Sequence, residues 1–168
     1  DFSIHECIDS ALLLLQHRLQ ANDQRPAVRV LKRYGYLPLV RCHPGQLNQV
    51  FMNVLANALD AFDTAGQGVS YATLEKSPHV LTLKSHLDEA GSQIMISIAD
   101  NGPGISAQTH AKMFEPLYTT KSTPHATGLG LAISKHIIEE NHGGQLRCDA
   151  GHDGGATFVI TLPIEGAD

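Results

Sequence analysis

The sequence predicts an α+β domain in which a mixed sheet carries helices layered on one face. Three segments have the apolar spacing of helices, and they alternate with groups of strands that are mostly joined as hairpins. The chain has 168 residues, the usual length of one domain, and contains no internal repeat, low-complexity tract or linker. We therefore expect residues 1–168 to form a single domain with its own hydrophobic core.

Helix start and stop signals bound the helical segments. Helices are expected over 4–19, 44–62 and 130–141. Ser3 and Glu6 form a capping-box pattern at the first start, and Pro44 suits the first turn of the second helix. The glycine pair at 143–144 ends the third helix.

Short alternating or β-branched runs predict five strands. They are expected over 28–34, 79–87, 93–99, 145–150 and 156–162. Residues 64–78 have the composition of a loop, and so does the longer segment 101–128, which we expect to be partly mobile. A loop of that length inside a compact domain is usually functional.

Composition excludes several classes of protein. A net charge of −5 with only 12 lysines and arginines argues against nucleic acid as a partner. The longest aliphatic run, Leu12–Leu15, is far too short to span a membrane. The cysteines, at positions 7, 42 and 148, are odd in number and suit reduced thiols in the cytoplasm, and no zinc-binding pattern is present.

The second helix carries polar residues on one face. Asn53, Asn57 and Asp60 cluster to one side of the apolar stripe. A solvated helix face would explain them, but asparagine in mid-helix lowers helix propensity without an evident structural return. Three short polar groups on one face can instead point into a shared cleft.

Two glycine-rich motifs flank the long loop. Asp100 follows an apolar strand, and its carboxylate can accept a hydrogen bond from an exocyclic amine while Gly102 and Gly104 allow close approach of a ring. Alone, this motif is also an ordinary turn. Gly128 and Gly130 open the third helix, where free N–H groups favour phosphate, but neither a dinucleotide-binding fingerprint nor a P-loop is present.

Taken together, the motifs resemble a known family. Their order is Asn-x-x-x-Asn-Ala-x-Asp-Ala, Asp-x-Gly-x-Gly, Phe-Glu-Pro-Leu-Tyr-Thr-Thr-Lys and Gly-Leu-Gly-Leu-Ala. This order resembles the catalytic, ATP-binding domain of bacterial sensor histidine kinases, which share the Bergerat fold with gyrase B, Hsp90 and MutL. The resemblance implies a two-layer α/β sandwich with a mixed, mostly antiparallel sheet. Three helices would cover one face of the sheet, and residues 106–127 would form a long ATP lid.

The resemblance also implies roles for individual residues. Asn57 would hold Mg²⁺, with Asn53 as a possible second ligand, and Asn53, Asn57 and Lys121 would be the catalytic residues. Asp100 would bind the adenine amine, with Thr157 close by through water. The residues implied around ATP are Asn57, Asp60, Ala61, Asp100, Gly102, Gly104, Ile105, Lys121, Thr127, Gly128, Leu129, Gly130, Leu131 and Thr157.

Three positions distinguish this chain within the superfamily. Hydrolytic relatives have a glutamate where this sequence has Asn53, and an amide cannot serve as a general base. This favours phosphoryl transfer over ATP hydrolysis. Many relatives have a basic residue at position 60 and some an aromatic residue at position 61, whereas this chain has Asp60 and Ala61.

The implied partners are a dimerisation domain that carries the phosphoacceptor histidine and the receiver domain of a response regulator. Neither the dimerisation domain nor a sensor region is recognised in this sequence, since His5-Glu6 has Ser10 where the acceptor motif has proline. We expect a cytoplasmic domain that is monomeric in isolation. It would come from a longer, homodimeric protein that can be anchored in a membrane. The alternatives are a serine-directed kinase of the anti-sigma-factor type and a non-catalytic, nucleotide-dependent docking module.

Overall fold

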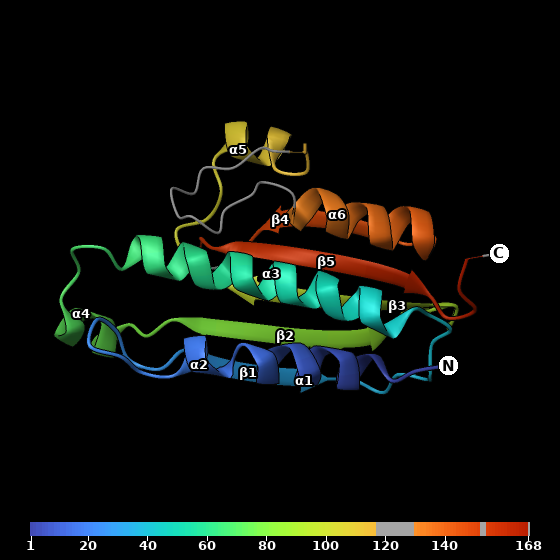
Figure 1. Ribbon diagram of the computed structural model, residues 1–168, viewed down its shortest axis with the longest axis horizontal. Helices are drawn as coiled ribbons and strands as arrows, with labels where there is room; N and C mark the ends of the chain where they lie inside the picture. The colour runs from blue at the N-terminus through green and yellow to red at the C-terminus, as the bar shows by residue number, and fades with distance from the viewer. Residues whose placement is uncertain (117–129, 152–153, 168) are drawn as a thin grey trace.

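A computed structural model describes residues 1–116, 130–151 and 154–167 (Figure 1). Its strands are β1 (Arg29–Tyr34), β2 (Val80–Leu87), β3 (Gln93–Asp100), β4 (Gln145–Ala150) and β5 (Ala156–Pro163). They form one sheet in the order β1-β2-β3-β5-β4. Only β1 and β2 pair in parallel, and the other pairs are antiparallel, so the predicted mixed and mostly antiparallel sheet is confirmed.

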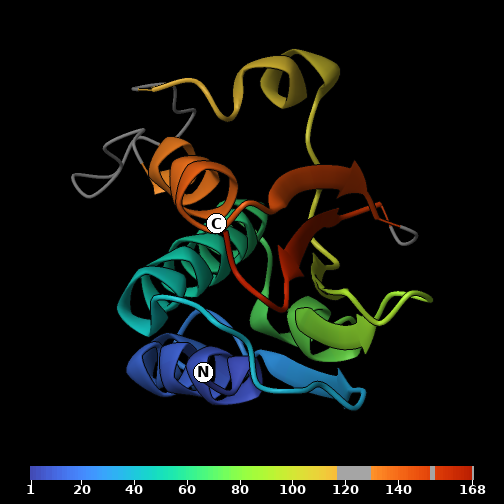
Figure 2. The same cartoon turned by 90° about the vertical axis from the view of Figure 1, so that its right-hand side faces the viewer.

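Three helices lie on one face of this sheet. They are α1 (Ile4–Leu14), α3 (Pro44–Ala65) and α6 (Gly130–His136), the last continued by a π-helical turn, η1 (Ile137–Asn141). Figure 2 shows these three helices on one side and the strands on the other, which is the two-layer arrangement that the resemblance implies. The core between the layers is continuous and includes Phe51, Phe62 and Phe158, all fully buried.

Helix α3 lies between α1 and α6 and is the element on which the candidate site is built (Figure 1). The side chains of its apolar stripe are fully or almost fully buried: Leu47, Val50, Phe51, Val54, Leu55, Ala58, Leu59 and Phe62. Because that stripe faces the sheet, the polar residues at 53, 57 and 60 lie along one side of the helix and are only half-buried.

Several boundaries differ from the predictions. The first helix breaks at Leu15 and continues as α2 (Gln16–Leu19), and α3 runs to Ala65 rather than to Phe62. Two short helices stand where loops were predicted. They are α4 (Tyr71–Lys76) and α5 (Ala107–Lys112). Each begins at a serine whose hydroxyl accepts the backbone N–H of the residue three positions later. Such an N-cap starts a helix but is not evident from the composition of the segment.

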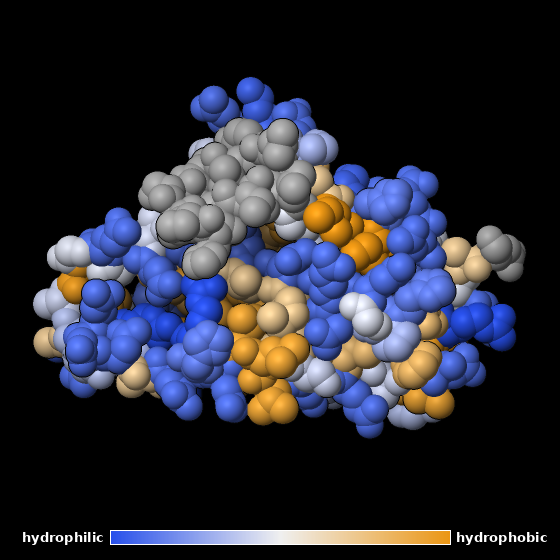
Figure 3. Space-filling model, viewed as in Figure 1, coloured by the Kyte–Doolittle hydropathy of each residue, from blue (hydrophilic) through white to orange (hydrophobic). Residues whose placement is uncertain are grey.

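The face shown in Figure 3 is mostly hydrophilic, with apolar side chains gathered over the C-terminal part of α1, where Leu13 and Leu14 are exposed. Among the described residues, no helix combines the length and the apolar character needed to cross a membrane. The three cysteines are free thiols.

A buried histidine joins the end of η1 to the start of α3. His142 is 3% exposed, and its Nδ1 lies 2.9 Å from the carbonyl oxygen of Ile137. Its Nε2 accepts the backbone N–H of His43, the N-cap residue of α3, at 3.1 Å. Both contacts require a neutral ring with the proton on Nδ1. Burial lowers the pKa of His142, and the charge of His43 lowers it further against the opposing hydrogen bond to Ile137.

We expect the free energy of unfolding to fall as the pH drops below about 6.5, the ordinary histidine pKa. Below that pH, His142 is protonated in the unfolded chain but still neutral in the folded chain. The unfolded state therefore binds more protons, and lowering the pH stabilises it relative to the folded state. Burial also lowers the pKa values of His5 and His79, which adds to the same trend. Urea unfolding at pH 7.5 and 5.5 measures the effect.

The variant His142→Phe isolates the contribution of His142. We expect it to be less stable than the natural chain at pH 7.5, by about 1–3 kcal/mol, because the buried His43 N–H loses its acceptor and the Ile137 carbonyl loses its donor. It should also lose less stability between pH 7.5 and 5.5. An unchanged pH dependence in the variant would contradict this role of His142.

Candidate functional site

One end of the candidate site lies where α3 meets the start of α6. The amide nitrogen Nδ2 of Asn53 donates to the carbonyl oxygen of Gly130 at 3.1 Å and to the hydroxyl of the buried Ser134 at 3.2 Å. The Ser134 hydroxyl itself donates to the same carbonyl at 2.8 Å. These bonds fix Gly130, at the start of α6, against α3, with Asn57 one turn further along α3 and half-buried.

The other end is the carboxylate of Asp100, the last residue of β3. Asp100 is only 9% exposed. Its Oδ1 accepts the backbone N–H groups of Gly102 at 2.9 Å and Ala156 at 3.3 Å, whereas no described residue donates to Oδ2. Burial raises the pKa of Asp100, and these two N–H donors and His79 offset part of that rise. One oxygen is thus fixed by the fold, and the other is left as an acceptor for a ligand.

Glycines surround Asp100 because the chain passes very close to it. A Cβ on Gly155 would lie 1.9 Å from the Asp100 carbonyl oxygen and 2.9 Å from its Oδ1. Gly104 has a φ of +82°, and a Cβ there would lie 2.3 Å from the carbonyl oxygen of Gly154. Gly102 and Gly104 were singled out from the sequence, whereas Gly155 was missed, although the pair Gly154-Gly155 before a strand was a usable signal.

Aromatic packing connects the C-terminal end of α3 to the Asp100 motif. Phe62 stacks on the ring of His79 with centroids 4.3 Å apart, and a Cβ on Gly102 would lie 3.6 Å from the Phe62 ring. The side chain of Asn101 holds the start of β2, accepting from Val80 N at 2.8 Å and donating to Pro78 O at 3.0 Å. Sequence reasoning missed Phe62 and His79, because only the fold brings them to this motif.

We expect Gly155→Ala to weaken adenine nucleotide binding about tenfold or more and to destabilise the fold by about 2 kcal/mol. The added methyl group displaces Asp100, and overpacking of a tight site costs energy of this order. A fluorescent ATP analogue and thermal melting measure the two effects. Gly45→Ala is the matched control, since a Cβ at Gly45 meets nothing within 4 Å. Its nucleotide affinity and its melting temperature should equal those of the natural chain.

The other residues predicted around ATP divide into two groups. Ala61, Ile105, Leu131 and Thr157 are described and half-buried, and Thr157 is the register partner of Ala99, beside Asp100. Asp60 is described and half-buried as well, and its carboxylate forms an ion pair with Arg18 at 2.8 Å, a contact that the sequence did not suggest. Lys121, Thr127, Gly128 and Leu129, with residues 117–127 of the predicted lid, lie outside the described residues.

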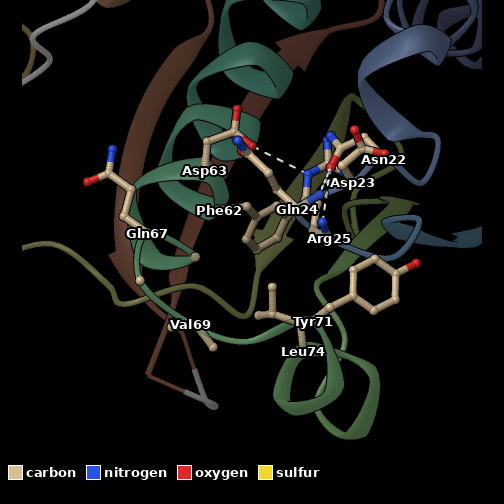
Figure 4. A pocket seen from close by; sticks show the side chains of 12 residues that line it. Asn22, Asp23, Gln24, Arg25, Phe62, Asp63, Gln67, Val69, Tyr71 and Leu74 are labelled. Carbon is tan, nitrogen blue, oxygen red and sulfur yellow. Dashed lines mark hydrogen bonds and ion pairs between the residues drawn. The ribbon is translucent and has the colours of Figure 1, made fainter.

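A cavity of about 400 Å³ lies beside the C-terminal end of α3, between the segment 22–25 and α4 (Figure 4). Phe62 and Leu74 form its apolar wall, and Arg25 and Asp63 form an ion pair at 3.4 Å on the other side. The cavity shares Phe62 with the Asp100 motif but contains none of the residues that the motifs predict. We therefore assign the candidate site to the motif residues and not to this cavity.

The motif residues fit a nucleoside triphosphate with a divalent cation. From Asn53, which contacts Gly130, to Phe62, whose ring a Cβ on Gly102 would meet, α3 advances roughly 13 Å, on the scale of an extended nucleotide. The Asp100 end offers a buried acceptor for an exocyclic amine. The Asn57 end offers amide oxygens, which Mg²⁺ accepts as ligands.

Comparison with known proteins shows which family and which relatives the chain is similar to. The family model described as "Histidine kinase-, DNA gyrase B-, and HSP90-like ATPase" matches residues 42–166. Sporulation kinase E of Bacillus subtilis is 36% identical over 128 residues, which are 76% of this chain and 15% of that protein. Sensor histidine kinase ZraS of Escherichia coli K12 is 31% identical over 156 residues, which are 90% of this chain and 30% of ZraS. The chain thus spans less than a third of either relative.

Solved structures share the fold. The catalytic domain of histidine kinase ThkA superposes with a TM-score of 0.76 and 24% identity, over 98% of this chain and 94% of that one. ThkA has also been solved in complex with the response regulator protein TrrA, where the TM-score is 0.71, the identity 21%, and the cover 97% of this chain and 41% of that one.

Proposed function

Since this chain belongs to the family of histidine kinase-, DNA gyrase B- and HSP90-like ATPases, we propose that it is the catalytic domain of a two-component sensor histidine kinase. It binds Mg²⁺ and ATP and delivers the γ-phosphoryl group to a histidine on a separate dimerisation domain. The observation that carries the proposal is the buried carboxylate of Asp100. It keeps one oxygen for a ligand at the far end of α3 from Asn53 and Gly130.

Asp100 selects the base. Its Oδ2 accepts the exocyclic amine of adenine, while the N–H groups of Gly102 and Ala156 hold Oδ1 so that the carboxylate cannot rotate away. Gly102 and Gly104 let the ring lie close to the backbone. Thr157 pairs with Ala99, the residue before Asp100, and Ile105 directly follows Gly104. A hydrogen bond to a charged group is worth about 1.5–3 kcal/mol, enough to distinguish adenine from guanine.

The phosphates lie along α3 toward the start of α6. Asn57 holds Mg²⁺ through its amide oxygen, and the ion neutralises phosphate charge. Asn53 holds Gly130 in place, and Lys121, Thr127, Gly128, Leu129 and Leu131 complete the phosphate site. Each of these groups positions the substrate, and none attacks it.

The identity of residue 53 separates transfer from hydrolysis. Asn53 donates its amide to Gly130 and Ser134, and an amide has no basic site that takes a proton from water. Transfer of the γ-phosphoryl group therefore requires a nucleophile from outside this domain. The nucleophile is the histidine of the dimerisation domain, which then passes the group to the receiver domain of a response regulator.

Transfer in trans tests this function. The chain is incubated with Mg²⁺, [γ-³²P]ATP and a dimerisation domain that carries an acceptor histidine. We expect label on that domain that is stable to alkali and lost in acid, as phosphohistidine is. Acid-stable phosphoserine on a partner would instead indicate a serine kinase. Tight ATP binding without any transfer would indicate a docking module, and either result overturns the proposal.

A further inference from the structure

We propose that Arg18 is a positioning residue of the nucleotide site, whose guanidinium neutralises Asp60 so that this side of α3 accepts a triphosphate. The inference rests on the function proposed above. It adds to the site a residue from α2, a helix that lies before the segment matched by the family model.

Asp60 adds a negative charge to the side of α3 that carries the residues proposed to bind Mg²⁺ and the phosphates. It follows Asn53 and Asn57 on α3 at spacings of seven and three residues, so the three side chains project from the same side of the helix. Residues three apart on a helix have their Cβ atoms about 5–6 Å apart, so Asp60 and Asn57 leave α3 at neighbouring points. A carboxylate at that distance repels the phosphates of ATP.

Arg18 meets this carboxylate directly. Its Nη2 lies 2.8 Å from Oδ1 of Asp60 and 3.0 Å from Oδ2 of Asp63. The side chains of Arg18 and Asp60 are only 26% and 29% exposed, so water screens the pair less than it screens a pair on the open surface. The positive charge is thereby held at Asp60, which shares one side of α3 with Asn53 and Asn57.

A second arginine holds Arg18 in place. Arg25 is 7% exposed and donates through Nη2 to the carbonyl oxygen of Arg18. Its Nη1 donates to the carbonyl oxygens of Gln20 and Pro26, both at 3.3 Å, and its Nε lies 3.4 Å from Asp63 (Figure 4). The backbone that carries Arg18 is therefore fixed against α3, and its guanidinium needs little ordering to reach Asp60.

The variant Arg18→Gln tests the proposal, with affinities for ATP, ADP and adenosine measured by calorimetry in the presence of Mg²⁺. Removal of the guanidinium leaves the Asp60 carboxylate with one positive charge fewer. We expect the affinity for ATP to fall about 5- to 20-fold and the affinity for ADP to fall less. The affinity for adenosine should change by no more than about twofold, because repulsion grows with the charge of the ligand. Arg33→Gln is the matched control, since Arg33 is an exposed arginine on β1.

Charge rescue separates this role from a structural one. Adding Asp60→Asn to Arg18→Gln should restore ATP affinity to within about threefold of the natural chain. If the role of Arg18 were merely structural, Arg18→Gln would lower the affinity for adenosine as much as the affinity for ATP. Adding Asp60→Asn would then not restore ATP binding. Either that pattern or an unchanged ATP affinity in Arg18→Gln overturns the proposal. If the natural chain itself binds no ATP, the proposed function fails instead.

Discussion

Replacement of Asp100 by asparagine is expected to lower the affinity for ATP about 100-fold and to leave the fold intact. The amide oxygen of asparagine can still accept the N–H groups of Gly102 and Ala156, so the backbone around it keeps its hydrogen bonds. The amide nitrogen then takes the place of Oδ2 and turns a donor toward the adenine amine. A charged hydrogen bond is lost and two donors oppose each other, which accounts for the size of the effect.

The base preference makes this prediction specific. A donor at that position suits the O6 acceptor of guanine, so the ratio of ATP to GTP affinity should fall more steeply than the affinity for ATP alone. Asp149→Asn on β4, which is separated from β3 by β5, is the control, because Asp149 is half exposed and pairs with Arg147. Equal losses for ATP and GTP, or a lowered melting temperature that explains the loss, would contradict the assignment.

Replacement of Asn57 by alanine is expected to weaken ATP binding about 30-fold or more when Mg²⁺ is present. The substitution removes the amide oxygen that we propose as the ligand of the ion, and alanine favours the helix, so α3 should keep its stability. In EDTA the natural chain and the variant should bind ATP with similar affinity. Calorimetric titrations with and without Mg²⁺ provide the comparison.

Asn48 offers a control on the same helix. Its amide points to α1 and donates to the carbonyl oxygen of Cys7 at 3.4 Å. Asn48→Ala should therefore leave Mg²⁺-dependent ATP binding unchanged. If Asn57→Ala lost the same affinity in EDTA as in Mg²⁺, its role would be in packing and not in holding the ion.

Periodicity predicted the parts of the fold that repeat. The stripe on α3 and the alternating residues of β3 are buried as their spacing indicates, since each burial pattern follows directly from helix or strand geometry. The π-helical turn at the end of α6 was not predictable in this way. It shifts the register of one turn, a feature that no residue propensity encodes.

The candidate site was predictable only where a motif carries it. Asp100, Gly102 and Asn57 lie within short recognisable strings. Arg18 reaches Asp60 across 42 positions of sequence, and Gly155 reaches Asp100 across 55, so no local pattern could reveal either contact. The resemblance favours a basic residue at position 60, and the ion pair with Arg18 gives the acidic residue found there a structural partner.

Calorimetric titration of the natural chain with ATP tests most directly whether α3 forms the wall of a nucleotide site. One molecule of ATP should bind per chain, with heat that appears with Mg²⁺ and is largely lost in EDTA. Absence of Mg²⁺-dependent heat at millimolar ATP, from a chain that melts cooperatively, would contradict the account.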